Sequence, residues 1–448
     1  RAPVGLGRGR SSDRARLPNR FAARRLNVRP HLLSLFTPSH AFNPRRPASP
    51  VPRTRLILFV VAACSLISVS PAATDELDFV PSSASSASDA GVPVDRALRP
   101  LEQALRSLHP ELVYTFVRAQ GVLSEPGNEQ ATTIQTVSLA TFINLGQFLI
   151  VRYRPSWSYY SNEAFDNSFA HEAGAQFARS LVEWNLRASY RFSDITVPLV
   201  ETGMQTSLEL HEATFQGQRR IGARSLLELS VRQSTRRAGE FSSSETWSTQ
   251  NWFHYELSES VSAAAGFVLG YASVGDGNDM SFHQLNGRIR WQPAGKLWLD
   301  ANGGVETRRF LDSDLDDAHT PVYGAALTYK PLDHTTLTIN GDQTVSSSYF
   351  QRQIHRTNSW QATLSQRVLG RFHVGLSYRR RGSSYSPTSA TTQADRQDEG
   401  RVWRIDVSTS LYHRGALTVF FQDKRNASTD PRFAFDGHQI GFHFSLAY

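Results

Sequence analysis

Arginine recurs at alternate positions in several segments of this chain, the spacing that places side chains on one face of an extended strand. The clearest pairs are Arg152 with Arg154, Arg288 with Arg290, and Arg379 with Arg381. A guanidinium binds a carboxylate or phosphate through two parallel N–H groups, so arginines that face one space would favour anions or acidic sugars. The alternative is a balanced network with acids on neighbouring strands. The register between neighbouring strands decides whether the arginines face an open space or are paired with acids, and the sequence does not give that register.

Side chains suited to catalysis are present, but not in a catalytic pattern. There is no His-Glu-x-x-His, Gly-x-Ser-x-Gly or phosphate-loop sequence. In His171-Glu172 and His211-Glu212 adjacent strand residues point to opposite faces, so neither pair shares a site. The single Cys excludes a disulfide framework and a multi-cysteine metal site. We therefore expect no enzyme activity, no cofactor and no metal.

The elements that carry these residues are predicted to be strands. From His109 onward the pattern has period two: Leu285, Gly287, Ile289 and Trp291 alternate with Gln284, Asn286, Arg288 and Arg290. Segments of about ten residues with this alternation are what membrane-crossing strands require. The apolar set would face lipid, because an Arg or Lys there costs about 2–4 kcal/mol near the midplane. The polar set would then face a lumen.

The residues expected to line this lumen follow from the same alternation, and their basic members outnumber their acidic ones. The basic residues are Arg152, Arg154, Arg187, Arg191, Arg232, Arg288, Arg290, Arg308, Arg379, Arg381, Arg404 and Lys424; the acids are Glu172, Glu209, Glu228, Glu256, Asp300, Glu306 and Asp406. Aromatic residues at strand ends are expected at the two membrane interfaces, among them Tyr153, Trp184, Trp291, Tyr329, Trp360, Tyr378 and Trp403.

The last segment, Gly437 to Tyr448, shows the alternation most clearly. Its apolar face consists of Ile440, Phe442, Phe444, Leu446 and Tyr448. This face continues to the final residue, where soluble domains usually end in polar sequence. An antiparallel barrel can surround such a strand with lipid and leave no unpaired edge. Taken by itself, this segment could also be an inner strand of a soluble β-sandwich.

The connections between strands alternate in length. Short turns are expected near 145–147, 180–183, 217–223, 257–260, 293–296, 331–334, 369–371 and 413–415. Longer polar loops are expected near 124–130, 161–168, 194–203, 238–245, 274–279, 311–319, 349–354, 384–399 and 426–436. An up-and-down barrel has one rim of tight periplasmic turns and one of longer outer loops. These connections predict an all-β transmembrane barrel of about eighteen antiparallel strands, with sixteen possible, over 112–448.

The front of the chain is predicted to be processing sequence. Residues 1–55 hold thirteen Arg and one acid, a net +12, so the rest carries a net −4 of the total +8 and gives no reason to expect nucleic-acid binding. We interpret 1–52 as a disordered leader or sequence upstream of the true start, and 53–73 as a signal peptide cleaved after Ala72 or Ala73. A lipoprotein box ending at Cys64 is the alternative.

Two segments precede the barrel. Residues 74–94 are rich in Ser, Ala, Asp and Pro and are predicted to be a flexible linker. Residues 95–110 are predicted to be a short periplasmic helix with a stripe of four Leu. None of the outer loops is long enough for a folded plug, and the longest, 384–399, is expected to be mobile. The helix is therefore the candidate plug.

With these features the chain resembles Gram-negative outer-membrane β-barrels. Phe442, Phe444, Leu446 and Tyr448 look like the aromatic-ended signal that the barrel-assembly machinery recognises in such chains. The segments 154–160, 291–296 and 329–333 also resemble hairpins of the putative β-barrel porin 2 family. That resemblance implies residence in the outer membrane after export; family members have no settled substrate, and some are associated with exopolysaccharide export.

Three functions remain open from the sequence. The first is a passive or weakly selective pore for small hydrophilic or anionic solutes. The second is an accessory barrel for exopolysaccharide export or surface anchoring, plugged by the N-terminal helix. The third is an outer-membrane hydrolase. The solute and the oligomeric state do not follow from the residues.

Overall fold

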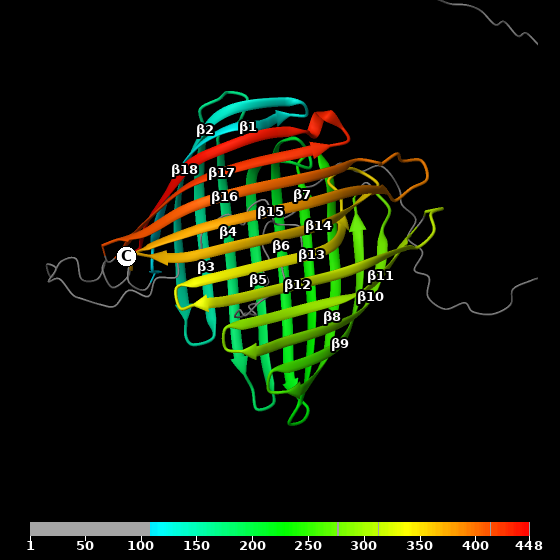
Figure 1. The fold of residues 1–448 in the computed structure, drawn as a ribbon. Helices are drawn as coiled ribbons and strands as arrows, with labels where there is room; N and C mark the ends of the chain where they lie inside the picture. Colours follow the sequence, from blue (N-terminus) through cyan, green and yellow to red (C-terminus); the bar gives the residue numbers. More distant parts are fainter. Residues whose placement is uncertain (1–107, 276, 312, 413, 448) are drawn as a thin grey trace, which may run out of the picture. The chain divides into compact units, whose positions relative to one another are not determined.

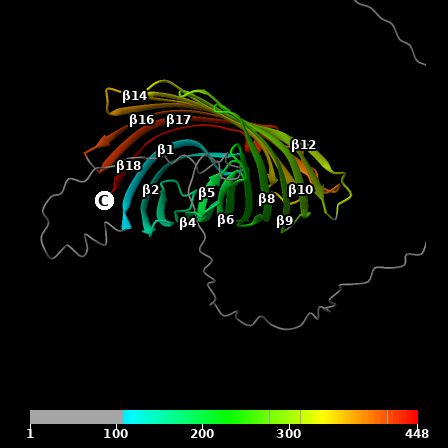
Figure 2. The same ribbon diagram turned by 90° about the horizontal axis from the view of Figure 1, so that it is seen from below.

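The strands of this chain close into a single barrel. The computed structural model describes residues 108–275, 277–311, 313–412 and 414–447. Within them eighteen strands pair antiparallel, each with its neighbours in sequence, and β1 also pairs with β18. Figures 1 and 2 show this arrangement, with β18 lying beside β1. The predicted antiparallel up-and-down barrel of eighteen strands is confirmed.

The strands are twelve to eighteen residues long, so many exceed the length needed to cross a bilayer. The first nine are β1 (Glu111–Glu125), β2 (Asn128–Leu145), β3 (Leu149–Tyr160), β4 (Ser168–Ser180), β5 (Trp184–Leu199), β6 (Met204–Arg220), β7 (Ser225–Ala238), β8 (Phe241–Ser258) and β9 (Val261–Val274). The others are β10 (Met280–Ala294), β11 (Leu297–Phe310), β12 (Ala318–Leu332), β13 (Thr335–Ser347), β14 (Gln353–Val368), β15 (Phe372–Pro387), β16 (Gln397–Leu411), β17 (Gly415–Ser428) and β18 (Phe435–Ala447).

The two rims differ in the length of most of their connections, but the connections 126–127 and 239–240 are two-residue turns where the sequence predicted longer loops. The connections that follow even-numbered strands are short turns, such as 295–296 and 333–334. Those that follow odd-numbered strands include the longer segments 311–317, 388–396 and 429–434. We call these ends the turn rim and the loop rim. The start of β1 lies opposite the end of β18 at the turn rim.

The two faces of the sheet differ in polarity. Residues directly opposite each other on paired strands share a face. On one face Leu285 lies opposite Phe267 and Val305, and all three are exposed. On the other face Gln284 lies opposite Glu306, which is buried. This register therefore gives the barrel an apolar outer face and a polar inner face.

Ile440, Phe442, Phe444 and Leu446 of β18 lie on the outer face, opposite residues of β1 that include Leu112 and Phe116. Tyr448 and residues 1–107 lie outside the described residues, and the predicted leader, signal peptide, linker and most of the 95–110 helix fall there. In the part of the chain that is described, no helix is long and apolar enough to cross a bilayer.

Glycines allow close approach at the seam between β1 and β18, and Gly121 and Gly437 face each other there. The backbone of Gly121 has a φ of 69°, and a Cβ there would overlap the carbonyl oxygen of Asp436. A Cβ on Gly437 would in turn overlap the carbonyl oxygen of Gln120. The pairing of β1 with β2 shifts register between Ala119 and Val122, which marks a bulge at this point. The bent strand can approach β18 closely only because both positions lack a side chain.

We expect Gly121→Ala to destabilise the barrel by about 2 kcal/mol or more, because it adds both a left-handed backbone penalty and a clash with the partner strand. Equilibrium unfolding of the refolded protein in detergent micelles measures this change. Gly146→Ala is the matched control, since Gly146 has a φ of 67° but open space around its Cβ position; its cost should be about 1 kcal/mol. Equal losses for the two variants would contradict the proposed role of the seam.

Candidate functional site: the lumen and its covered mouth

Of the nineteen charged residues expected to line the lumen, eighteen lie on the inner face, and Glu209 is the exception. Arg152 is opposite Phe142 and Gly174, and neighbouring Tyr153 is an exposed outer residue. The same register places on the inner face Arg154, Arg187, Arg191, Arg232, Arg288, Arg290, Arg308, Arg379, Arg381, Arg404, Glu172, Glu228, Asp300 and Asp406. This position turns them toward the lumen, where Arg152 and Arg191 are exposed and Arg308 and Arg404 are buried.

Many of these arginines have carboxylate partners on the same or the next strand. Asp300 contacts Arg290 at 2.6 Å and Arg288 at 3.8 Å. The other pairs are Arg154 with Glu172 at 2.6 Å, Arg308 with Glu306 at 2.8 Å, Arg404 with Asp406 at 3.5 Å, and Arg232 with Glu212. Over most of the wall the charges therefore form the balanced network that the sequence left open.

One predicted lumen residue is on the wrong face. Glu209 lies opposite Arg237 and bonds to His211 on the outer face, whereas Glu212 lies inside with Arg232. The apolar residues Leu208 and Leu210 lie on the inner face of β6, which is the reverse of the general rule that apolar residues face lipid. Near the loop rim, however, these two leucines are covered from inside by Tyr349 and its neighbours.

A group of inner arginines on β3 and β5 lacks such partners. Arg152, Arg187 and Arg191 form no ion pair or hydrogen bond with another described residue. Arg152 and Arg191 both lie opposite Gly174 of β4, so their backbones are about 10 Å apart with no side chain between them. Both are exposed. Glu212 lies directly opposite Arg191 but contacts Arg232, so the β3–β5 wall presents an excess of positive charge to the lumen.

The loop rim is covered by contacts that cross the mouth. Glu201, in the connection 200–203, accepts hydrogen bonds from Ser348 Oγ at 2.7 Å and from the Tyr349 N–H at 2.8 Å. Arg236 of β7 donates to the carbonyl oxygens of Ser347 and Ser348. The connection after β5 thus touches the connection after β13, eight strands further around the closed sheet. Contacts over that separation must bridge the opening.

A second junction is centred on Arg396. Its guanidinium binds the Asp398 carboxylate at 2.6 Å and donates to the carbonyl oxygen of Glu201 at 2.8 Å. It also lies 3.6 Å from the ring centroid of Phe433 and 4.6 Å from that of Tyr385. We call the connections 200–203, 348–352, 388–396 and 429–434 the mouth cluster. The loop predicted to be mobile is therefore tied down, and several short connections together cover the mouth.

Little in the sequence points to this cluster. Glu201, Arg236, Arg396 and Asp398 are ordinary loop and strand-end charges in the sequence, and none was predicted as a site residue. Their partners come from distant connections, so only the closed sheet brings them together. Aromatic residues in polar connections, Tyr349, Phe350 and Phe433, are the sequence feature that could have pointed to it.

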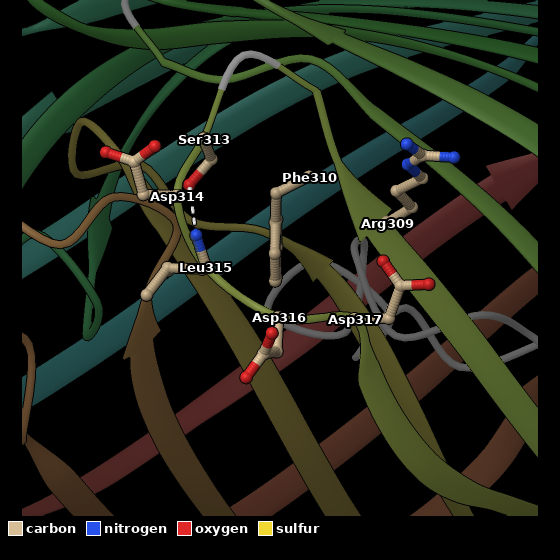
Figure 3. Close-up of a pocket in the computed structure, with 7 residues that line it drawn as sticks. All are labelled: Arg309, Phe310, Ser313, Asp314, Leu315, Asp316 and Asp317. Carbon is tan, nitrogen blue, oxygen red and sulfur yellow. Dashed lines mark hydrogen bonds between the residues drawn. The ribbon is translucent and has the colours of Figure 1, made fainter. Parts of the chain in front are cut away.

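A separate open pocket of about 760 Å³ lies at the β11–β12 connection. It is lined by Arg309, Phe310, Ser313, Asp314, Leu315, Asp316 and Asp317. Figure 3 shows the three aspartate carboxylates pointing in different directions, with Ser313 bonded to the Leu315 N–H. Ser313 also donates to the Thr388 carbonyl oxygen at 2.8 Å, which joins this connection to the mouth cluster. In the described residues no group of His, Cys, Asp and Glu is arranged to hold a metal ion.

The two His–Glu neighbours lie on opposite faces of their strands, as predicted. Glu172 faces the lumen with Arg154, whereas His171 bonds to the outer residue Tyr153 at 2.8 Å. Glu212 and His211 separate in the same way. Neither adjacent pair forms a shared acid–base site.

No family model matches this chain, and no curated protein matches it either. Solved structures with a similar fold include OccK11 (OpdR) of Pseudomonas aeruginosa, with 10% identity and a TM-score of 0.42 over 77% of this chain and 96% of that one. OccK2 (OpdF) of the same organism, in complex with glucuronate, has 12% identity and a TM-score of 0.43 over 77% and 99%. A BenF-like porin from Pseudomonas fluorescens Pf-5 has the same identity and TM-score over 77% and 100%. The barrel assignment rests on the strand pairing of this chain and not on these similarities; the likeness to the putative β-barrel porin 2 family stays a prediction.

Replacing Arg396 should open the mouth. Arg396→Gln removes the contacts to Asp398, Phe433 and the Glu201 carbonyl together, so the connections it joins should separate. In planar bilayers we expect larger single-channel steps than for the unmodified protein. Arg371→Gln, an exposed change at the turn rim, is the control and should leave the steps unchanged. Identical steps for Arg396→Gln and the unmodified protein would mean that the cluster does not restrict the opening.

Acid should open the same mouth through Glu201. Burial by itself raises the pKa of Glu201, but His355, Arg236 and the hydrogen bonds from Tyr349 and Ser348 outweigh it and hold the pKa below its ordinary 4.5. A carboxyl with a lowered pKa contributes its stabilisation above its unfolded value and loses it as pH falls through the folded value. Conductance should therefore rise only below about pH 4.5, and Glu201→Gln should lack this rise. A rise of the same size in the variant would assign it to other carboxylates.

Proposed function

We propose that this chain is an outer-membrane β-barrel that forms a pore for small hydrophilic solutes and favours anions among them. The observation that carries the proposal is the closed eighteen-stranded sheet with exposed apolar residues outside and charged residues inside. Such a sheet can stand in lipid because no strand edge is left unpaired. A barrel of this size leaves a water-filled interior unless something plugs it.

Export follows from the same proposal. The segment 53–73 would act as a signal peptide, and the apolar face of β18 would be recognised by the barrel-assembly machinery. The turn rim would face the periplasm and the loop rim the exterior, the usual arrangement of such barrels. The chain would act without catalysis: the adjacent pairs His171–Glu172 and His211–Glu212 occupy opposite faces and form no shared acid–base site.

The preference for anions rests on the β3–β5 wall. Six of the eleven predicted inner arginines contact carboxylates, which balances their charge toward a passing solute. Arg152, Arg187 and Arg191 are the inner arginines of β3 and β5 without such partners. A guanidinium in a narrow aqueous space attracts carboxylate or phosphate groups and raises their local concentration. The solutes favoured would be small acids and acidic sugars.

The mouth cluster favours a second candidate function. A barrel whose opening is crossed by its own connections could serve as an accessory barrel for exopolysaccharide export, closed until a partner engages it. Bilayer recording separates the two functions. Steady steps from the unmodified protein support a pore, whereas silence that changes to conductance in Arg396→Gln supports the closed accessory barrel.

The charge preference is tested by reversal potential in a salt gradient. We expect the unmodified barrel to prefer chloride over potassium, and Arg152→Gln with Arg191→Gln to shift the reversal potential clearly toward cations. The control is Arg154→Gln with Glu172→Gln, which removes a neutral pair from the same wall. This control should keep the original reversal potential. A shift of equal size in the control, or none in the first variant, would contradict the assignment.

A further inference from the structure

The outer face of β14–β18 changes character in three successive cross-strand rows. The lowest row is Leu364, Leu376, Ile405, Phe421 and Ile440. The next row toward the loop rim contains Ala362, Tyr378, Trp403, Asp423 and His438, and the third contains Trp360, Arg380, Arg401, Arg425 and Asp436. Aliphatic residues are followed by aromatic residues and then by arginines, the order of a hydrocarbon, interfacial and headgroup layer.

The arginines of the third row stand side by side. Arg380 is directly opposite Arg401, and Arg401 is directly opposite Arg425. Like charges in directly opposite positions destabilise a sheet unless an anion lies between them. Glu399 contacts Arg380 at 3.1 Å and Arg401 at 2.6 Å, but Arg425 is exposed and has no ion pair with a described residue. The row is therefore only partly neutralised by the chain itself.

The sector around this row carries more positive charge than the opposite sector. On the outer face near the loop rim, β14–β18 and β1 hold Arg356, Arg380, Arg401, Arg425 and Arg118 against Glu399, Asp423 and Asp436. The corresponding surface of β4–β8 holds Arg237 against Asp194, Glu209 and Glu245. The excess is thus two positive charges in one sector and two negative charges in the other, at a similar level of the barrel.

We propose that the Arg380–Arg401–Arg425 row is a binding site for the phosphate groups of an anionic lipid in the outer leaflet. Trp403 and Tyr378, whose rings are 4.3 Å apart, would contact the acyl-chain boundary directly beneath the phosphate. Guanidinium groups bind phosphate through paired hydrogen bonds, and exposed arginines at this depth lose little hydration in doing so. The inference rests on the proposed membrane location but not on conduction through the lumen.

The test is native mass spectrometry of the full barrel in detergent, titrated with diphosphoryl lipid A and separately with dephosphorylated lipid A. We expect retained diphosphoryl lipid and weak retention of the dephosphorylated form. Replacing Arg380, Arg401 and Arg425 together by Gln should weaken diphosphoryl binding about tenfold or more, since each interfacial arginine adds a substantial attraction to an anionic lipid. Arg425→Gln alone, which breaks no contact within the described residues, should give a smaller loss in the same direction.

The matched control is Arg237→Gln, an exposed outer arginine in the acidic sector, which should leave lipid retention unchanged. Equal retention by the triple variant, or equal retention of both lipid forms, would overturn the proposal. Displacement of the lipid by millimolar inorganic phosphate would also overturn it, because it would show an anion site without lipid selectivity. If the protein inserts into bilayers and conducts but retains no phosphorylated lipid, only this inference fails; if it does not insert at all, the proposed membrane pore fails first.

Discussion

The structure depends on hydrogen bonding between the first strand and the last. A sheet left open would present unpaired backbone groups, and in hydrocarbon each of them costs several kcal/mol. Pairing of β1 with β18 removes both edges, and Gly121 and Gly437 permit the close approach that this pairing needs. Closure also separates an outer face from an inner face. Every functional argument about lipid or lumen follows from that separation.

The inner face combines two kinds of charge. Where arginines and acids of neighbouring strands meet, as at Arg290 and Asp300, the wall is polar and close to neutral. On β3 and β5, Arg152, Arg187 and Arg191 form no ion pair within the described residues, so a solute would meet the field of these three cations. The lumen is therefore not uniformly basic, although the sequence counts more inner bases than acids. Local pairing, and not the total charge, decides where an anion would be attracted.

The mouth cluster illustrates how short connections can act together. No individual connection is long enough to fold into the lumen as a plug, yet Glu201, Arg236 and Arg396 link connections from opposite sides of the barrel. Each link is a charged group that bonds to backbone carbonyls or N–H groups, which is stronger than a neutral hydrogen bond. The links cross an opening, so the restriction would respond to the charge of Glu201.

The sequence by itself determined the strands, their number and the face of nearly every charged residue, because a period of two and alternating loop lengths are local properties. Residues such as Arg288 and Ile440 are on their predicted faces for that reason. The sequence pattern predicted the wrong face for Glu209. At that point the leucines of β6 point inward and are covered by the connection after β13, so an apolar residue there does not indicate a lipid-facing position. Only the tertiary structure decided which arginines are neutralised and which connections meet over the mouth. Both depend on register and on ring closure, which place residues hundreds of positions apart within hydrogen-bond distance.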